Sequence, residues 1–186
     1  AARVLDHHRV VAEVGQAQRF PQQAAVARAQ IELSAGGADA ALQQAKQDAV
    51  DLGEAASESL LRSVADRLVA EGRVGEANDV VSGALARHPD SSSLHEMQGL
   101  LLFRMGRDGE ARGRFEKSIE LDAKNGRARA GLAGLSARAG DAPRAIELLD
   151  EATKANPADT VPAYAAAQLV FRAGDVTAAR QRLEAI

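Results

Sequence analysis

The stretch at residues 92–125, SSLHEMQGLLLFRMGRDGEARGRFEKSIELDAKN, decides the fold, because the chain repeats it at a fixed period. A forward shift of 34 residues brings it onto residues 126–159, and a backward shift of 34 brings it onto residues 58–91. A second forward shift reaches residues 160–186. A strict period of this length is the sequence signature of stacked helical hairpins. We therefore predict an all-α fold in which pairs of antiparallel helices stack on one another.

The composition agrees with a helical stack and excludes several other classes of protein. The 186 residues are 46% hydrophobic but only 3% aromatic, so close helix-to-helix approach must form the interior. The absence of cysteine excludes a disulfide framework, a thiolate nucleophile and a cysteine-based zinc site. The net charge of −3 argues against bulk attraction to nucleic acid or to an anionic membrane. No apolar run approaches the roughly 18 residues that a membrane helix needs, so we expect no direct membrane insertion.

Residue types recur at fixed positions in the four units that begin at residues 58, 92, 126 and 160. Positions 8 and 20 hold only alanine or glycine, which lets two helices approach closely: Ala65, Gly99, Ala133, Ala167 and Ala77, Ala111, Ala145, Ala179. Position 15 is always glycine, which can take the left-handed conformation that ends a helix: Gly72, Gly106, Gly140, Gly174. Position 24 holds a large apolar residue that fills the space beside the small ones: Val81, Phe115, Leu149, Leu183.

This set of positions resembles the tetratricopeptide repeat (TPR) family, whose pattern has small residues at positions 8, 20 and 27, glycine near 15 and proline at 32. The resemblance covers residues 58–186. It implies a right-handed α-solenoid, the TPR superhelix, with about ten or eleven helices in the whole chain. The repeats would span 58–91, 92–125 and 126–159, with an incomplete repeat at 160–186. The family's aromatic residues at positions 4 and 11 are absent here, which affects the detail of the packing.

Residues 1–57 carry helical periodicity without the clean repeat, and we interpret them as a divergent, TPR-like N-terminal segment. Helices are predicted at about 2–18, at 21–34 and at 39–52. The chain starts without an initiator methionine and stops within its last repeat, which indicates a fragment of a longer protein. Frequent alanine, arginine and glycine favour a bacterial source. We expect a soluble protein of the bacterial cytoplasm or periplasm.

No constellation of residues indicates catalysis, a cofactor or a metal ion. The adjacent His7 and His8 would point about 100° apart on a helix and would make a poor chelate. No HExxH, GxSxG or P-loop pattern occurs, and the glycines fall at turn positions. We therefore predict a protein that is not an enzyme and that holds neither cofactor nor metal.

The resemblance implies a binding surface on the concave side of the stack, lined by the first helix of each unit. The candidate partner-binding residues on that surface are Leu100, Phe103, Arg104, Arg127, Ala130, Gly134, Arg138, Tyr164, Gln168, Phe171 and Arg172. The middle unit offers only small side chains between Phe103 and Phe171, and arginine recurs at position 13 of the last three units. We hypothesise an apolar pocket between the two phenylalanines, edged by three guanidinium groups. It would suit a peptide or helix with an apolar anchor and acidic groups.

The same residues also have an explanation without a ligand. A cation in the last turn of a helix is favoured by the helix dipole, and small residues permit tight stacking. One established version of the groove, the clamp for a C-terminal carboxylate in chaperone-binding members, is poorly matched. Its positions would hold Arg62, Asp66, Met97, Arg127 and Gly131, and Asp66 would repel the carboxylate.

The function that the sequence favours is a non-enzymatic protein–protein interaction scaffold that binds a peptide or helix in its concave groove. One alternative is a structural spacer or assembly segment of a longer multi-repeat bacterial envelope or secretion protein, for example in polysaccharide export. Another alternative is the regulatory tail of an enzyme whose catalytic domain is absent. The expected partner is a protein or peptide and not nucleic acid, and the uncapped C-terminal face would permit homo-association.

Overall fold

The computed structural model describes Asp39, Gln43 and residues 54–185, which are helical or lie in turns between helices. There is no strand among these residues, so the prediction of an all-α solenoid of helix pairs is confirmed. The helices are α4 (Glu54–Ala70), α5 (Val74–Arg87), α6 (Ser92–Arg104), α7 (Asp108–Leu121), α8 (Gly126–Arg138), α9 (Ala142–Ala155), α10 (Val161–Arg172) and α11 (Val176–Glu184). The helices predicted at 2–18 and 21–34 lie outside the described residues. Asp39 and Gln43, within the third predicted helix, are helical.

The chain divides into two compact units, residues 1–84 and residues 85–186. In the first unit, α4 has one apolar face, and the buried residues of α5 are small or medium-sized. The buried apolar residues of this unit are Leu60, Leu61, Val64, Ala65, Leu68, Ala77, Val81 and Ala84. On α4, Leu60, Val64 and Leu68 recur every four residues, which is the spacing of one helix face.

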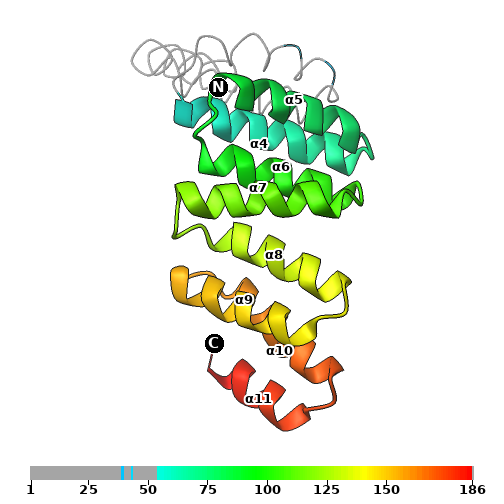
Figure 1. Cartoon of the computed structure of the whole chain (residues 1–186), viewed down its shortest axis with the longest axis vertical. Helices are drawn as coiled ribbons and strands as arrows, with labels where there is room; N and C mark the ends of the chain where they lie inside the picture. The colour runs from blue at the N-terminus through cyan, green and yellow to red at the C-terminus, as the bar shows by residue number, and fades with distance from the viewer. Residues whose placement is uncertain (1–38, 40–42, 44–53, 186) are drawn as a thin grey trace, which may run out of the picture. The chain divides into compact units, whose positions relative to one another are not determined.

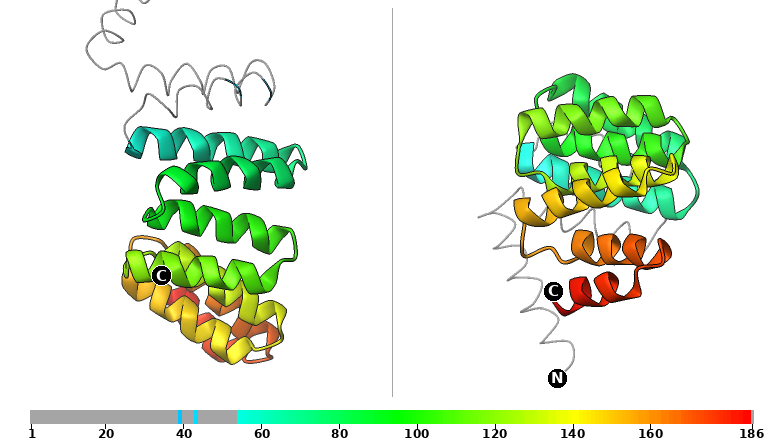
Figure 2. Two further views of the ribbon diagram at one scale, coloured as in Figure 1. Left: turned by 45° about the horizontal axis from the view of Figure 1, so that its top comes forward. Right: turned by 60° about the horizontal axis from the view of Figure 1, so that its bottom comes forward.

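The second unit consists of three helix pairs. The two helices of a pair lie antiparallel, as Figures 1 and 2 show. Helix α6 packs on α7, α8 on α9, and α10 on α11. Neighbouring pairs meet because α7 also contacts α8 and α9 also contacts α10. The first helices of two successive pairs, α6 and α8, contact each other directly. This contact brings together the helices on which the sequence places the groove.

Every described hairpin turns at a glycine in the left-handed conformation, as predicted for position 15. The four φ angles are 79° at Gly72, 75° at Gly106, 85° at Gly140 and 96° at Gly174. In the second unit, the residue after each glycine donates its N–H to the carbonyl five residues earlier, for example Arg107 to Leu102 at 2.9 Å. This is the Schellman arrangement, which satisfies carbonyl groups at the end of a helix.

The residue that follows this glycine differs between the early and the late hairpins. Asp141 and Asp175 cap α9 and α11, because their carboxylates accept N–H groups three residues later at 3.1 and 2.8 Å. At the same place, Arg73 and Arg107 pair with a glutamate three residues later. Their guanidinium groups lie 2.6 and 2.7 Å from that carboxylate. The same turn is therefore closed by a cap in one case and by an ion pair in the other.

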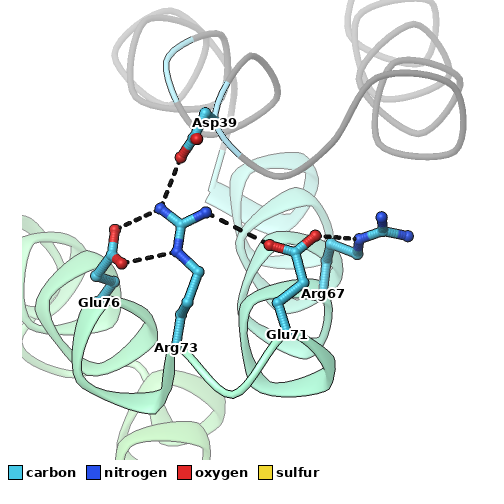
Figure 3. A network of polar contacts seen from close by, with 5 residues as sticks. All are labelled: Asp39, Arg67, Glu71, Arg73 and Glu76. Carbon is cyan, nitrogen blue, oxygen red and sulfur yellow. Dashed lines mark hydrogen bonds and ion pairs between the residues drawn. The ribbon is translucent and has the colours of Figure 1, made fainter.

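Around Arg73 the ion pairs form a network, shown in Figure 3. Its Nη2 lies 2.6 Å from carboxylate oxygens of both Glu76 and Asp39, and Nη1 lies 3.4 Å from Glu71. The hydrogen bond to Glu76 raises the pKa of Arg73 most, and the hydrogen bond to Asp39 raises it further. A hydrogen bond from Arg67 lowers the pKa of Glu71. Because the network is open to solvent, each pair contributes little to stability.

Three ion pairs join an aspartate to an arginine about one repeat later in the chain. The pairs are Asp39–Arg73, Asp108–Arg138 and Asp150–Arg182, with separations of 34, 30 and 32 residues. In a solenoid, residues one period apart lie in neighbouring repeats, so these contacts link successive helix pairs. Asp150 binds the Arg182 guanidinium at 2.6 and 3.0 Å and raises its pKa.

The core of the second unit is centred on Phe115, the large residue at position 24 on α7. Its side chain is fully buried. A Cβ on Gly99 of α6 would lie 2.6 Å from the Phe115 ring, and one on Gly131 of α8 would overlap the ring more closely still. Both glycines are therefore needed so that two helices can close on one ring. The buried residues of this cluster are Leu102, Ala111, Phe115, Ala128, Leu132, Ala133, Leu135, Ala145, Leu148, Leu149 and Ala166.

We expect Gly131→Ala to lower the free energy of unfolding by about 1–3 kcal/mol, because the added methyl group meets an enclosed ring. Chemical denaturation measures the change. The matched control is Gly113→Ala, which lies within α7, is exposed and has no atom within 4 Å of its added Cβ. It should raise the free energy of unfolding by about 0.5–1 kcal/mol. Changes of the same sign in both variants would contradict this account of the core.

Candidate functional site

A hollow of about 890 Å³ lies between α6, α8 and the start of α10. The loops that join α7 to α8 and α9 to α10 complete its wall. The lining residues are Glu96, Leu100, Phe103, Asp122, Lys124, Asn125, Gly126, Arg127, Ala130, Gly131, Gly134, Asn156, Ala158, Asp159, Val161 and Pro162. The helices supply the apolar residues of this set except Ala158, and most of its polar residues come from the two loops.

The space exists because α8 presents small side chains toward α6. Ala130, Gly131 and Gly134 lie within about one turn of α8 and line the hollow. Opposite them, Leu100 and Phe103 of α6 are half-buried. A Cβ on Gly134 would lie 3.4 Å from the Phe103 ring, so the ring sits directly against the α8 backbone. One end of the hollow is therefore apolar.

Phe103 is held in place by Arg138, at the end of α8. The guanidinium carbon lies 3.5 Å from the centroid of the Phe103 ring, which is a cation–π contact. Arg138 Nη1 also donates a hydrogen bond to the Phe103 carbonyl at 3.0 Å and lies 2.5 Å from Asp108 Oδ1. Arg138 does not line the hollow. It therefore contacts the ring from outside the hollow and binds the C-terminal end of α6.

The other end of the hollow carries two cationic side chains, those of Lys124 and Arg127. Lys124 and Arg127 are exposed, and neither side chain has a hydrogen-bond or ion-pair partner in the part of the chain that the structure describes. Two neighbouring carboxylates accept backbone N–H groups: Asp122 from Lys124 at 2.9 Å and Asp159 from Val161 at 3.0 Å. The charged groups without partners at this end are therefore cationic.

The α7–α8 loop is fixed by a hydrogen-bonded cluster of Ser92, Ser118 and Asn125. Asn125 Oδ1 accepts the Ala128 N–H at 3.1 Å and so caps α8. Its Nδ2 donates to Ser118 Oγ at 2.9 Å and to Ser92 Oγ at 3.1 Å, and Ser118 Oγ donates to the Ser92 carbonyl at 2.9 Å. The cluster joins the starts of α6 and α8 to α7, because Ser92 begins α6, Ser118 lies on α7 and Asn125 caps α8. Ser118, which bonds to both Ser92 and Asn125, is fully buried.

Two buried polar residues of α6 lie near the hollow. Glu96 lines it with only 2% of its surface exposed, and it is engaged within the protein. His95 is also buried, and its Nε2 lies 2.8 Å from the Pro89 carbonyl, so that nitrogen donates. The other nitrogen, Nδ1, then accepts from Arg114 Nη1 at 3.4 Å. These partners assign His95 a structural role.

The structure brings five of the predicted partner-binding residues into the hollow: Leu100, Phe103, Arg127, Ala130 and Gly134. Arg138 lies behind Phe103, as described above. The remaining predicted residues are exposed on α6 and α10 and do not line the hollow: Arg104, Tyr164, Gln168, Phe171 and Arg172. Tyr164 and Phe171 are 53% and 60% exposed. The hollow thus contains the first phenylalanine of the predicted pocket and not the second, and the pocket stays a prediction.

The sequence reasoning did not include the loop residues Asp122, Lys124, Asn125 and Asp159. It assigned the groove only to first helices, whereas these four residues follow second helices. It also grouped Arg138 with the other arginines at position 13 and did not identify Phe103 and Asp108 as its partners. In a solenoid, residues about one period apart lie in neighbouring repeats. Arg138 follows Phe103 by 35 residues and Asp108 by 30, so the sequence separation alone could have indicated both partners.

Two findings limit the chemistry of the described part of the chain. Among those residues, no group of three or more histidine, cysteine, aspartate or glutamate side chains could hold a metal ion. No described helix combines the length and the apolar character that are needed to cross a bilayer.

Sequence models of the family named tetratricopeptide repeat match residues 65–125 in one case, and 102–169 and 136–186 in another. Together the matched segments cover more than half of the chain. The chain belongs to the tetratricopeptide repeat family. Repeats of this family are in general non-catalytic, and they support a role as a scaffold for protein–protein interaction in this chain. Among curated proteins, no sequence matches it.

Solved structures with the same fold include three TPR proteins at low sequence identity. PilF of Pseudomonas aeruginosa has a TM-score of 0.69 and 18% identity, over 88% of this chain and 73% of its own. MamA of Desulfovibrio magneticus RS-1 has a TM-score of 0.64 and 17% identity, over 88% and 91%. YrrB, described as a TPR protein with an unusual peptide-binding site, has a TM-score of 0.56 and 18% identity, over 93% and 89%. These likenesses show the fold alone.

We expect Arg138→Gln to lower the free energy of unfolding by about 1 kcal/mol, because it removes a cation–π contact and an exposed ion pair. Arg104→Gln is the matched control, since Arg104 ends α6 as Arg138 ends α8 and has no partner among the described residues. It should change stability by less than about 0.5 kcal/mol. Urea denaturation of both variants measures the difference. Equal effects would show that the contacts of Arg138 with Phe103 and Asp108 do not stabilise the fold.

Proposed function

We propose that this chain is a non-enzymatic interaction scaffold that binds a segment of a partner protein in the hollow between α6, α8 and α10. The partner segment carries an apolar anchor and acidic groups. The observation that supports this most is the composition of the hollow: half-buried Leu100 and Phe103 at one end, and the cations of Lys124 and Arg127 at the other. Apolar anchors in pockets and charge-assisted hydrogen bonds are the usual sources of affinity and orientation in such sites.

The rival proposal is a spacer that only separates other parts of a longer bacterial envelope or secretion protein. A spacer needs no concave surface of mixed chemistry. The hollow combines half-buried apolar side chains at one end with the cations of Lys124 and Arg127 at the other, and this combination favours binding. The compartment and the division into four repeat units stay predictions from the sequence.

A charge-reversal experiment separates these two functions. We expect the wild-type chain, used as bait in extracts of its source cells, to retain a partner that the double variant Lys124→Glu/Arg127→Glu loses. The control is Arg112→Glu/Arg180→Glu, which makes the same change of charge at two exposed arginines that do not line the hollow. Quantitative mass spectrometry compares the three baits. Equal recovery by all three would favour the spacer.

Homo-association is a second proposal, and it is supported by the surface of the last helix pair. Of the large apolar residues that are exposed in the described part of the chain, all but Met105 lie on α10 and α11: Val161, Tyr164, Phe171, Val176 and Leu183. Contact between two copies of this face would cover these side chains.

We expect sedimentation velocity to show a mass that rises with concentration for the wild-type chain and stays monomeric for Leu183→Lys, because Leu183 is exposed on this face. The chain Met105→Lys, with a similarly exposed residue outside α10 and α11, is the control. A wild-type monomer at every concentration would refute the association.

A further inference from the structure

We infer that the hollow binds a segment whose acidic group and apolar anchor lie roughly 10 Å apart, with the acidic group at the N-terminal end of α8. The inference rests on the proposed function and adds to it the order and the spacing of the partner's groups. It follows from where the cations, the carboxylates and the Phe103 ring sit along one helix.

The spacing comes from α8, which runs along the hollow. Arg127, Ala130 and Gly134 all line the hollow and recur at intervals of three and four residues, so they share one face of the helix. Phe103 packs against the backbone at Gly134. Arg127 and Gly134 are seven positions apart, which corresponds to roughly 10 Å along the helix axis at about 1.5 Å per residue. The cationic and apolar ends of the hollow are therefore separated by about this distance.

The sign of the charge comes from which groups are already engaged. Glu96 is buried, with only 2% of its surface exposed, and Asp122 and Asp159 each accept a backbone N–H. Lys124 and Arg127 have no partner among the described residues. A carboxylate of a bound segment can accept hydrogen bonds from both cations, whereas a cationic group would be repelled by them and would leave them without a partner.

The apolar end is built to receive a side chain without moving. Arg138 covers the Phe103 ring from outside the hollow and donates a hydrogen bond to the Phe103 carbonyl in the last turn of α6. Gly134 is covered by the ring itself, and Ala130, one turn earlier on the same face of α8, adds only a small side chain to the wall beside it. An apolar side chain that enters therefore meets a ring that is already in place, so little conformational freedom is lost on binding.

Oligoproline peptides test the spacing, because their polyproline II helix is rigid, with about 3.1 Å per residue and three residues per turn. A peptide with Glu and Phe three positions apart presents both side chains on one face at roughly 9 Å. A second peptide separates them by six positions, at roughly 19 Å. Further peptides with the three-position spacing replace Glu by Gln or Lys, or Phe by Ala. Fluorescence anisotropy with the whole chain measures binding of each labelled peptide.

We expect the peptide with Glu and Phe three positions apart to bind at least about tenfold more tightly than each of the other peptides. Each of the others loses either a charge-assisted hydrogen bond or a buried apolar anchor, and either loss is worth about that factor. On Lys124→Glu/Arg127→Glu, the advantage of Glu over Gln should disappear. The charge-matched control Arg112→Glu/Arg180→Glu should keep it.

Three results would overturn the inference. Tighter binding of the Lys peptide would assign the charged end to Asp122 and Asp159 instead. Equal binding at both spacings would remove the 10 Å separation. A preference for Glu that survives Lys124→Glu/Arg127→Glu would place the acidic group elsewhere. The recovery of the native partner, measured with the same variants, decides separately whether the hollow is a binding site at all.

Discussion

The arrangement of the second unit depends on the contact of one aromatic ring with two glycines. Phe115 of α7 fills the space between α6 and α8 and touches the helices where Gly99 and Gly131 lack side chains. The chain has few aromatic residues, so this ring supplies volume that smaller side chains elsewhere cannot. Because the ring holds α6 and α8 at a fixed separation, it also sets the width of the hollow that lies between them.

The elements that could be predicted from the sequence are those in which a residue type has one physical role. Glycine at position 15 predicts a left-handed turn, and all four turns have it. Small residues at positions 8 and 20 predict close contact between helices, and Ala77, Ala111 and Ala145 are fully buried. These constraints act on the backbone and on the residue itself, so periodicity reveals them.

The site could be predicted only in part, because its chemistry depends on side-chain partners. Gly131 gave no sign of its role, since its approach to Phe115 requires knowledge of which helices face each other. Arg138 looked equivalent to Arg104 and Arg172, yet it alone of the three has a phenylalanine ring beneath it. The same position in successive repeats therefore shares a place in the fold without sharing a function. The polar end of the hollow comes from loops, whose conformation depends on capping contacts such as those of Asn125.

The ion pairs that join neighbouring repeats have a mechanical consequence. Asp108–Arg138 and Asp150–Arg182 bridge successive helix pairs through side chains that are about one third or more exposed to solvent. Such pairs contribute only about 0.2–1 kcal/mol, and water can replace either partner when they separate. These ion pairs therefore resist bending between successive helix pairs only weakly, and the apolar packing around Phe115 is what holds α6 and α8 apart. Loss of either ion pair would leave the width of the hollow unchanged.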